Sequence, residues 1–378
     1  MNAIGLLLLL HGYIGWRLFP NLPLDTLGRL LGWLCLAASC ALIPAGMLAR
    51  RIKRQPLGDR VAWAGLLTMG LFSSLLVLTV LRDLLLLGWG ALQVLFPAAA
   101  LPDLRLWSAA AAPLLALLFT LIGLVNARRR AKVVEVDIPL ANLPAALHGF
   151  TIVQISDIHL GPTIKGDYLD AIVDSVNELN ADMIAVTGDL VDGSVGQLAA
   201  HTAPLARLSS RHGTYFVTGN HEYYSGVNAW VVELRRLGLC VLMNEHVVLE
   251  SSGASLLLAG VTDYSAHHYN PAHASDPQRA LAGAPAGVKV KILLAHQPRS
   301  AASAARAGFD LQLSGHTHGG QFFPWNFFVR LQQPFTAGLN RLNNLWVYTS
   351  RGTGYWGPPK RLGAPSEITR LRLVSAPV

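Results

Sequence analysis

The chain has 378 residues, of which 52% are hydrophobic and only 14% are charged. Soluble globular chains usually carry about 25% charged residues, so this composition excludes a single ordinary soluble domain, a disordered chain and a small disulfide-rich scaffold. The formal net charge of +8 arises within residues 1–130, which hold twelve Lys and Arg against four Asp and Glu, whereas residues 131–378 hold eighteen of each. The basic excess therefore indicates charges that flank membrane segments, and it gives no reason to expect a nucleic-acid partner.

Four apolar runs near the start of the chain approach or reach the length of about 20 residues that crosses the hydrocarbon core of a membrane. The predicted spans are residues 4–19, 27–48, 61–81 and 108–125. The first run lacks the basic n-region and the small-residue cleavage site of a signal peptide, so we interpret it as a span. Residues 84–100 are also apolar and leave three alternatives open: a fifth span, a re-entrant segment, or an extension of the third helix.

Two basic clusters predict the orientation of these spans. They lie at Arg50–Arg54 and Arg128–Lys132, and clusters of this kind favour the cytoplasmic side of a membrane. Both clusters share a side only if an even number of spans separates them, which predicts four spans with both termini in the cytoplasm. Residues 1–127 then form a polytopic transmembrane region, and residues 128–149 form a basic juxtamembrane linker.

From residue 150 onward, apolar β-rich runs alternate with amphipathic segments of helical length. Three strand–helix units follow one another, with strands predicted at Phe150–Ile155, Met183–Thr187 and Thr214–Thr218. The later predicted strands have fewer helices between them, so we expect a second sheet. The fold class predicted by these patterns is an α-helical membrane region followed by an α/β domain over residues 150–375.

Polar clusters follow five of the predicted strands. The first three strands end in D-x-H, G-D and G-N-H-E, and two later ones end in a single His and in G-H-T-H. In open α/β sheets, ligands bind outside the carboxyl ends of the strands, so these clusters are expected to converge. The side chains that can ligate metal are Asp157, His159, Asp189, Asn220, His296, His316 and His318.

These seven side chains suit two metal ions better than one. Oxygen and nitrogen ligands without thiolate favour Mn, Fe, Zn or Ni over Ca or Mg. Seven ligands exceed the needs of a single ion but fit two ions that share a bridging carboxylate. Two metals about 3.5–4 Å apart polarise a phosphoryl oxygen and generate hydroxide, so the set predicts two divalent cations and phosphoester hydrolysis.

The ordered motifs resemble the signature of the calcineurin-like metallophosphoesterase family. They read D-x-H, G-D, G-N-H-E, H and G-H-T-H-G-G-Q in that order. Together with Ser350–Gly354, the last motif resembles the membrane-associated bacterial branch, which includes transmembrane proteins with a C-terminal metallophosphoesterase domain. The resemblance covers about Phe150–Leu373 and implies a four-layer α/β-β/α metallophosphoesterase sandwich with a dinuclear metal centre.

The resemblance also implies roles for individual residues. One metal would be bound by Asp157, His159 and His318. The other would be bound by Asn220, His296 and His316. Asp189 would bridge the two, and His221 would contact the phosphate and assist the leaving group as the catalytic residue.

The expected function is that of a membrane-anchored phosphoesterase that cleaves a phosphodiester or pyrophosphate bond with metal-activated hydroxide. Two alternatives stay open: a pyrophosphohydrolase acting on a nucleotide-diphospho-lipid of lipid A synthesis, and a non-catalytic membrane sensor or scaffold. The expected partners are a phosphorylated small-molecule or lipid-linked substrate and the lipid bilayer. The expected location is a bacterial inner membrane with the catalytic domain in the cytoplasm.

Two further segments near the predicted site have alternative interpretations. Arg351 and Arg361 lie in a Gly- and Pro-rich loop and either clamp a substrate phosphate or are ordinary surface arginines. Gly319–Phe335 holds six aromatic residues. It is either a loop that packs its own aromatics over the sandwich, or a lipid-facing or acyl-binding wall beside His316 and His318.

Overall fold

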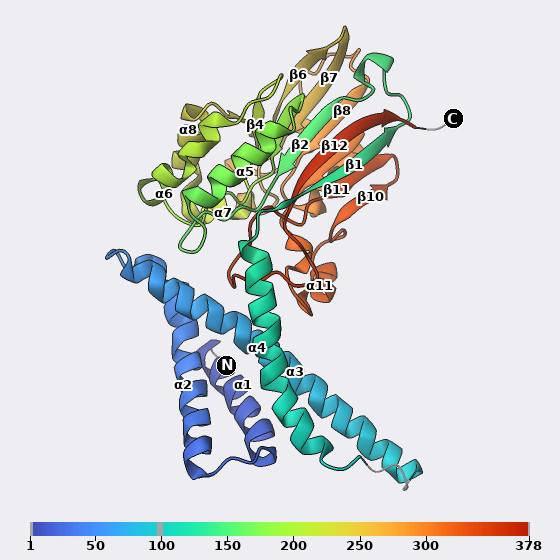
Figure 1. The fold of residues 1–378 in the computed structure, drawn as a ribbon. Helices are drawn as coiled ribbons and strands as arrows, with labels where there is room; N and C mark the ends of the chain where they lie inside the picture. The colour runs from blue at the N-terminus through green and yellow to red at the C-terminus, as the bar shows by residue number, and fades with distance from the viewer. Residues whose placement is uncertain (1–2, 97–100, 377–378) are drawn as a thin grey trace. The chain divides into compact units, whose positions relative to one another are not determined.

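The computed structural model describes residues 3–96 and 101–376, and it divides into two compact units (Figure 1). The helical unit comprises Met1–Asn126 together with a short later segment, Gly357–Leu362. The α/β unit comprises Ala127–Trp356 and Gly363–Val378. The chain therefore passes between the two units three times.

Among its described residues, the helical unit contains four helices that are long and apolar enough to cross a membrane. Their bounds are α1 Ala3–Leu18, α2 Thr26–Leu48, α3 Leu57–Leu95 and α4 Leu104–Arg128. The start of α2 is fixed by Asp25, whose side chain accepts a hydrogen bond from the backbone N–H of Gly28 at 2.7 Å, because this bond satisfies one of the unpaired N–H groups of the first turn.

Helix α3 runs without a break through the charged pair Arg82-Asp83 and on to Leu95. Residues 84–95 are therefore an extension of the third helix, and residues 97–100 of the ambiguous apolar stretch lie outside the described residues. The helix continues because its charges are paired: Asp83 accepts hydrogen bonds from Tyr13 at 2.7 Å and from Arg17 at 2.7 Å. At 1.5 Å per residue, the 39 residues of α3 extend for about 58 Å, well beyond a hydrocarbon core of about 30 Å.

The α/β unit is built on two six-stranded sheets. The first has the order β1-β12-β2-β3-β4-β5. Its strands are β1 Lys132–Leu140, β2 Thr151–Ile155, β3 Met183–Val186, β4 Thr214–Phe216, β5 Cys240–Val241 and β12 Glu367–Ser375. The second has the order β10-β11-β9-β8-β7-β6. Its strands are β6 Glu245–Ser251, β7 Ala254–Gly260, β8 Val290–Leu294, β9 Leu311–Ser314, β10 Gly338–Leu342 and β11 Leu345–Thr349.

One strand lies within the stretch that the sequence predicted to be a linker. β1 occupies Lys132–Leu140 and pairs in parallel with β12, from Lys132 opposite Glu367 to Leu140 opposite Ser375. Its sequence alternates apolar and polar residues, as expected for a strand with one solvated face. Within residues 128–149, Lys132–Leu140 are therefore an edge strand of the first sheet, and Ala145–Leu147 form a short 3₁₀ helix.

Helices cover the outer faces of both sheets. On the first sheet these are α5 Gly166–Glu178, α6 Val195–Thr202 and α8 Val227–Arg236, and the short helix α7 Asn220–Ser225 lies after the end of β4. On the second sheet they are α9 Pro277–Ala280 and α10 Ala301–Ala307, and α11 Trp325–Phe328 lies in the long loop between β9 and β10.

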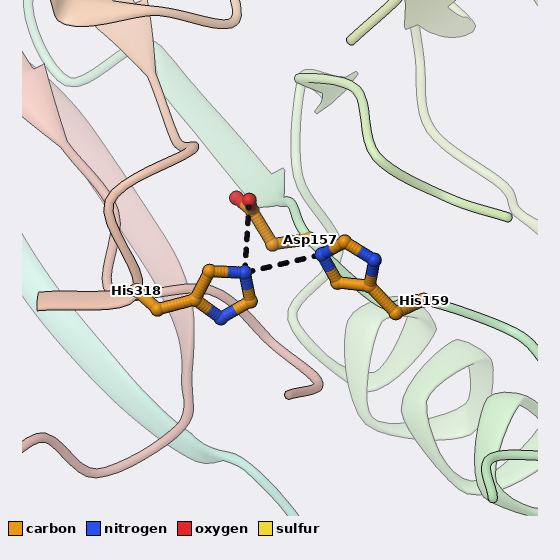
Figure 2. Close-up of side chains that lie close together, drawn as sticks. All are labelled: Asp157, His159 and His318. Carbon is orange, nitrogen blue, oxygen red and sulfur yellow. Dashed lines mark hydrogen bonds and ion pairs between the residues drawn. The ribbon is translucent and has the colours of Figure 1, made fainter. Parts of the chain in front are cut away.

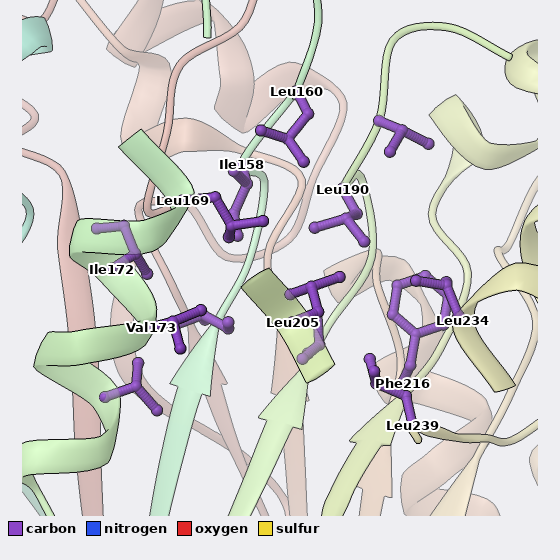
Figure 3. Close-up of a cluster of buried hydrophobic side chains, with 14 of the residues drawn as sticks. Ile158, Leu160, Leu169, Ile172, Val173, Leu190, Leu205, Phe216, Leu234 and Leu239 are labelled. Atoms are coloured by element: carbon purple, nitrogen blue, oxygen red, sulfur yellow. The ribbon is translucent and has the colours of Figure 1, made fainter. Parts of the chain in front are cut away.

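Successive side chains of a strand point to opposite faces of its sheet, so each sheet of the α/β unit contributes to two apolar cores. Val153 and Ile155 of β2 point to the helices, where they join the apolar cluster shown in Figure 3, whereas Ile152 points to the second sheet and packs in the same cluster as Ile292 of β8. A further cluster lies between the second sheet and its own helices. The resulting order of helices, sheet, sheet and helices confirms the predicted four-layer sandwich.

Candidate metal centre

The predicted ligands lie on five loops, each at the carboxyl end of a strand. The loop after β2 carries Asp157 and His159, the loop after β3 carries Asp189, α7 begins at Asn220 after β4, the loop after β8 carries His296, and the loop after β9 carries His316 and His318. β2, β3 and β4 are parallel to one another, as are β8 and β9. Parallel strands present their carboxyl ends at one edge, and this topology brings the ligand loops together.

The first two ligand loops are also hydrogen-bonded to each other. The backbone N–H of His159 donates to the carbonyl of Asp189 at 3.1 Å, and that of Asp192 donates to the carbonyl of Leu160 at 2.8 Å. Leu160 and Val191 form a parallel β-bridge between these bonds. This extension of strand pairing fixes His159 beside both Asp189 and Asp192.

Five of the seven candidate ligands have a left-handed backbone. Their φ angles are 54° for Asp157, 56° for His159, 52° for Asp189, 69° for His316 and 50° for His318. Non-glycine residues adopt this region infrequently, and such strained positions gather at functional sites. Two glycines make room for the carboxylates: a Cβ at Gly219 would collide with Asp189, and a Cβ at Gly315 would collide with Asp157.

Asp157, His159 and His318 form the first group of ligand atoms (Figure 2). The Nε2 atoms of His159 and His318 lie 3.1 Å apart, and Nε2 of His318 lies 3.4 Å from Oδ1 of Asp157. Ligand atoms about 2.0–2.1 Å from a tetrahedral metal are about 3.3–3.4 Å from each other, so these spacings suit a shared cation. All three residues are buried.

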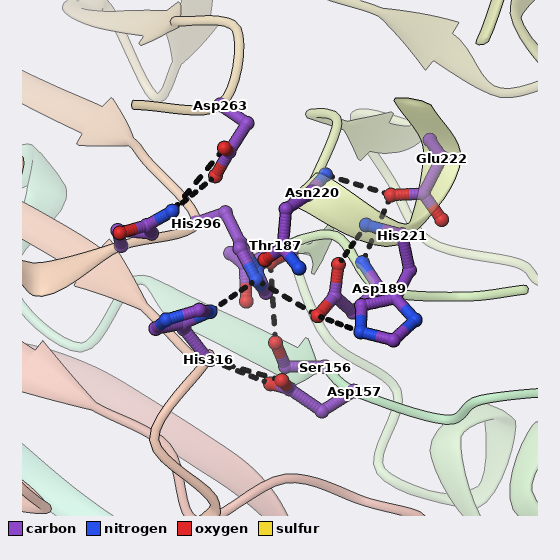
Figure 4. A network of polar contacts seen from close by, with 12 residues as sticks. Ser156, Asp157, Thr187, Asp189, Asn220, His221, Glu222, Asp263, His296 and His316 are labelled. Atoms are coloured by element: carbon purple, nitrogen blue, oxygen red, sulfur yellow. Dashed lines mark hydrogen bonds and ion pairs between the residues drawn. The ribbon is translucent and has the colours of Figure 1, made fainter. Parts of the chain in front are cut away.

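Asp189, His296 and His316 form the second group (Figure 4). Nε2 of His296 lies 3.1 Å from Oδ2 of Asp189 and 3.2 Å from Nδ1 of His316. The other ring nitrogen of His296 faces the carbonyl of Thr187 at 2.7 Å. A donated bond there leaves the Nε2 lone pair for a metal, which is the usual way in which an outer partner orients a ligating histidine.

Asn220 supplies an independent test of whether a metal fits. Its buried Oδ1 atom has no hydrogen-bond partner among the described residues, although its Nδ2 group donates to the hydroxyl of Tyr224 at 3.3 Å. A buried acceptor without a partner costs about 1–3 kcal/mol. A cation beside Asp189 and His296 would satisfy this oxygen, so the residues present fit a metal.

Asp189 faces both groups. Its Oδ2 atom lies 3.1 Å from Nε2 of His296 and 3.9 Å from Nε2 of His159. Its Oδ1 atom accepts a hydrogen bond from the backbone N–H of His221 at 2.9 Å. Asp189 therefore lies within 4 Å of one imidazole of each group.

Asp189 and His316 of the second group have the protonation states of metal ligands. Burial raises the pKa of Asp189, but His296, followed by His221 and His159, outweighs this effect and holds the pKa well below its usual range. Burial, followed by the neighbouring charge of His296, lowers the pKa of His316 to about 3. His316 is therefore neutral, as metal ligation requires. Burial lowers the pKa of His296, but the negative charge of Asp189 outweighs it and raises that pKa well above its usual value, so a cation bound here would displace a proton from His296.

His221 points its side chain into the same cluster without belonging to either of the two triads. Its Nδ1 atom lies 2.5 Å from Oδ1 of Asp192, and its Nε2 atom lies 3.9 Å from Oδ2 of Asp189. Burial acts to lower the pKa of His221, but the carboxylates of Asp189 and Asp192 outweigh it and raise the pKa to about 9. His221 also forms a third candidate ligand group with His159 and Asp189. The metal content of a His221 variant therefore distinguishes a proton donor from a metal ligand.

Two carboxylates near the centre were not singled out from the sequence. Asp192 faces Nδ1 of both His159, at 3.2 Å, and His221. Glu222 is fully buried and accepts backbone hydrogen bonds from Gly219 at 2.7 Å and from Asp189 at 3.0 Å. The sequence signal for Asp192 is its place three residues after Asp189 in the same loop, and that for Glu222 is the last letter of the G-N-H-E motif.

The two candidate substrate arginines have other environments. The guanidinium of Arg351 donates to Oε2 of Glu367 at 2.8 Å. Arg361 is 1% exposed, and its backbone N–H donates to the carbonyl of Gly123 in α4 at 2.9 Å, within the helical unit. Arg361 is therefore not a surface arginine, because the segment that carries it packs among the membrane-length helices.

Aromatic side chains surround His221 and form what we call the aromatic rim: Tyr224, Tyr269 and Trp356. The rings of Tyr224 and Trp356 lie 5.0 Å and 5.7 Å from that of His221, and each residue is 51% exposed. Tyr269 is 5.6 Å from Tyr224. The backbone of Trp356 is bound on both sides by the side-chain amide of Gln321, at 2.9 Å each.

Comparison with known proteins agrees with this geometry. The family model described as calcineurin-like phosphoesterase matches residues 150–320. A "Transmembrane protein with metallophosphoesterase domain" from Bos taurus is 44% identical over 281 residues, covering 70% of this chain and 63% of that protein. The protein of the same name from Danio rerio is 42% identical over 274 residues, covering 69% of this chain and 62% of that protein.

A bacterial relative is matched over more of its length. An "Uncharacterized metallophosphoesterase" from Aquifex aeolicus is 35% identical over 219 residues, covering 57% of this chain and 82% of that protein. The chain spans a little under two thirds of the two vertebrate relatives, and the resemblance is not confined to bacteria. Its four membrane-length helices and its transmembrane relatives identify a membrane protein. The chain belongs to the calcineurin-like metallophosphoesterase family.

Proposed function

We propose that this protein is a membrane-anchored phosphoesterase that hydrolyses a phosphodiester or pyrophosphate bond at a dinuclear metal centre. The observation that carries the proposal is the pair of ligand triads that meet at Asp189, whose Oδ2 atom lies 3.1 Å from His296 and 3.9 Å from His159. The unpartnered Oδ1 atom of Asn220 supports it independently.

One cation would be held by Asp157, His159 and His318, and the other by Asn220, His296 and His316, with Asp189 between them. Divalent cations there would stabilise the charge of the phosphoryl group and acidify a water molecule at neutral pH. The chain itself holds these ligands in place before any substrate arrives, through the strained backbone of five of them and the buried carboxylate of Glu222.

His221 is proposed to donate a proton to the leaving oxygen. Because its Nδ1 atom is held by Asp192 at 2.5 Å, its Nε2 atom faces the cluster and is the nitrogen that can meet the substrate. The carboxylates of Asp189 and Asp192 raise the pKa of His221 against the effect of burial, so the imidazole carries the proton that a general acid must supply. A scaffold that needed metals only for its structure would not need this arrangement.

The aromatic rim favours a second, narrower candidate, the hydrolysis of a nucleotide-diphospho-lipid such as those of lipid A synthesis. Tyr224 and Trp356 flank the proposed acid and are each half exposed. Exposed Tyr and Trp faces stack on bases, with about 1–3 kcal/mol gained per base. A nucleoside in the leaving group would use these rings, whereas a simple phosphodiester would not.

We further propose four membrane spans with the α/β unit in the cytoplasm, which for a bacterial chain means the inner membrane. The basic residues of Arg50–Arg54 and Arg128–Lys132 support this orientation. A fluorescent protein fused after Val378 should be fluorescent in bacterial cells, and an alkaline phosphatase fused there should be inactive. An active phosphatase fusion would reverse the proposed orientation.

The activity is tested on the full chain in detergent with Mn²⁺, using bis-p-nitrophenyl phosphate and an organic pyrophosphate. The native chain should hydrolyse at least one of them, and Asp189→Asn should not. Asp174→Asn is the matched control, because Asp174 is an exposed acid that pairs with Arg207 on the surface, and it should retain full activity. A native chain that binds two metals but hydrolyses neither compound would favour the sensor or scaffold.

A further inference from the structure

The long loop between β9 and β10 exposes a cluster of apolar side chains, which we call the aromatic tip. Its members are Phe323, Trp325, Phe327, Phe328 and Leu331, with exposures of 43%, 45%, 62%, 52% and 81%. Five of nine consecutive residues are therefore large, apolar and solvent-exposed. Soluble surfaces rarely gather apolar side chains in this way unless the patch contacts a membrane, a ligand or another protein.

The aromatic tip stands on a stem that is firmly bound to the α/β unit. Thr317 donates to the carbonyl of Thr336 at 2.6 Å, which closes the loop at its base. Arg299 donates to the carbonyl of Gln332 at 2.6 Å. Phe322, directly before the tip, is 6% exposed. The exposure of the tip is thus a property of an ordered loop, since both of its ends are held.

The stem also pairs with the two residues that flank Gly357–Leu362, the segment that belongs to the helical unit. Gln321 is hydrogen-bonded to Trp356, and Phe322 forms a β-bridge with Gly363. The aromatic tip therefore starts directly after Gln321 and Phe322. The residues that pair with these two, Trp356 and Gly363, are covalently joined to the segment of the helical unit.

Within the helical unit, the same segment is bound among membrane-length helices. The ammonium group of Lys360 donates to the carbonyl of Gly70 at 3.3 Å, to the hydroxyl of Ser74, and to the hydroxyl of Thr120 at 3.1 Å. Gly70 and Ser74 belong to α3, and Thr120 belongs to α4. Residues 357–362, which directly follow Trp356 in the chain, are thus bound to α3 and α4.

We propose that the aromatic tip docks into the interface between the lipid bilayer and water. Trp and Phe concentrate at the headgroup level of membranes, and a neighbouring basic side chain, here Arg330 at the edge of the tip, favours anionic lipid headgroups. A bilayer is the occupant that the chain's continuity supports, because the residues paired with the stem are covalently joined to the unit that carries the membrane-length helices.

Docking of the tip would set the position of the metal centre relative to the lipid. His318 precedes Phe323 by five residues, a distance of at most about 18 Å along an extended chain. Phosphate bonds in or near lipid headgroups would then be within reach of the site. The docking itself requires no catalysis, so it does not depend on the proposed function.

The test uses the full chain in nanodiscs of phosphatidylcholine and phosphatidylglycerol. Cys35, Cys40 and Cys240 are first replaced by Ala, and a polarity-sensitive fluorophore is attached to Phe327→Cys or Leu331→Cys. The matched control is Val232→Cys on α8, because Val232 is 68% exposed in the same unit, and α8 and α11 lie well apart in Figure 1. Lipids that carry a shallow nitroxide are then added as quenchers, and the metal content of each variant verifies its fold.

Labels at positions 327 and 331 should emit at shorter wavelength than the label at 232 and should lose at least half of their intensity to the nitroxide lipids. The label at 232 should lose little. Equal, water-like emission at all three positions would overturn the proposal. Shielding at 327 and 331 without quenching by lipid would also overturn it, since a protein surface would then cover the aromatic tip.

Discussion

The two units bury polar groups in different ways. In the helical unit, three charged side chains of α1 and α3 are paired with one another: Asp83 lies 2.7 Å from Arg17 and 3.3 Å from Arg82. In the α/β unit, similar groups face each other instead, with imidazole nitrogens of His159 and His318 only 3.1 Å apart. Ion pairs between opposite charges stabilise a fold, whereas several electron-pair donors that face one another form a binding site for cations.

The difference extends to the backbone. The paired residues of the helical unit lie within regular helices, among them Arg17 in α1 and Asp83 in α3. The converging residues lie on loops, and five of them have left-handed backbones. Strain of this kind persists only where surrounding structure imposes it. Replacing a paired group should therefore lower stability, and replacing a converging group should lower metal binding or activity.

The largest effect on turnover, with metals retained, is expected for His221→Ala. Loss of a general acid slows a reaction by about 10²–10⁴-fold. The loss should be near this range for an alkyl phosphodiester, whose leaving group needs a proton, and much smaller for an activated aryl ester. Steady-state kinetics with both substrates, together with elemental analysis, measure the effect.

Two results would change the role of His221. A variant that loses a metal would make His221 a ligand in the third candidate group with His159 and Asp189. Full activity on both substrates would remove the acid role and strengthen the scaffold alternative.

A smaller effect is expected for Asp192→Asn. Asp192 contacts no candidate metal position directly but holds the Nδ1 atoms of both His159 and His221. Outer partners of metal ligands contribute about 10–100-fold to affinity or activity. We expect a loss in this range, expressed in kcat more than in KM, with weakened metal affinity measured by competition with a chelator. An unchanged kcat would show that Asp192 does not position His221.

Trp356→Leu tests the aromatic rim. The ring of Trp356 lies 5.7 Å from His221 but contacts no ligand triad, so metal content and kcat for bis-p-nitrophenyl phosphate should change little. A nucleotide-linked pyrophosphate should show a KM about 5- to 150-fold higher if its base stacks on this ring, the range that corresponds to about 1–3 kcal/mol. Equal KM values for native and variant chains would remove the support for the nucleotide candidate.

Asp83→Asn should leave activity almost unchanged and lower stability instead. The substitution removes a charge that Arg17 contacts at 2.7 Å, and the loss of a hydrogen bond to a charged group costs about 1.5–3 kcal/mol. Thermal unfolding of the full chain in detergent should begin at lower temperature, with two metals still bound. Loss of metal in this variant would break the distinction between the two units.

The succession of strands and ligand loops along the chain was predictable because the signals for it are local in the sequence. Each ligand cluster closes an apolar run, and the carboxyl ends of parallel strands must meet at one edge. The four-layer sandwich that the resemblance implied is confirmed by the two sheets and their three apolar clusters.

The features that the sequence did not reveal depend on distant partners. β1 was expected to be a linker because its partner β12 lies more than 200 residues later. The sequence left three alternatives for residues 84–100 because the partners of Arg82 and Asp83 on α1 and α4, which let α3 continue, are not visible locally. Likewise, nothing in Gly357–Leu362 itself indicates that it packs with the helical unit.

The most direct test of the account is the metal content of purified full-length Asp189→Asn, measured by elemental analysis beside the native chain and Asp174→Asn. Asp189 is the one carboxylate that faces both ligand triads of the described structure, and a neutral amide bridges two divalent cations poorly. We predict two metals per chain in the native protein and in Asp174→Asn, and fewer than one in Asp189→Asn. Two tightly bound metals in Asp189→Asn would contradict the shared centre on which the proposed function rests.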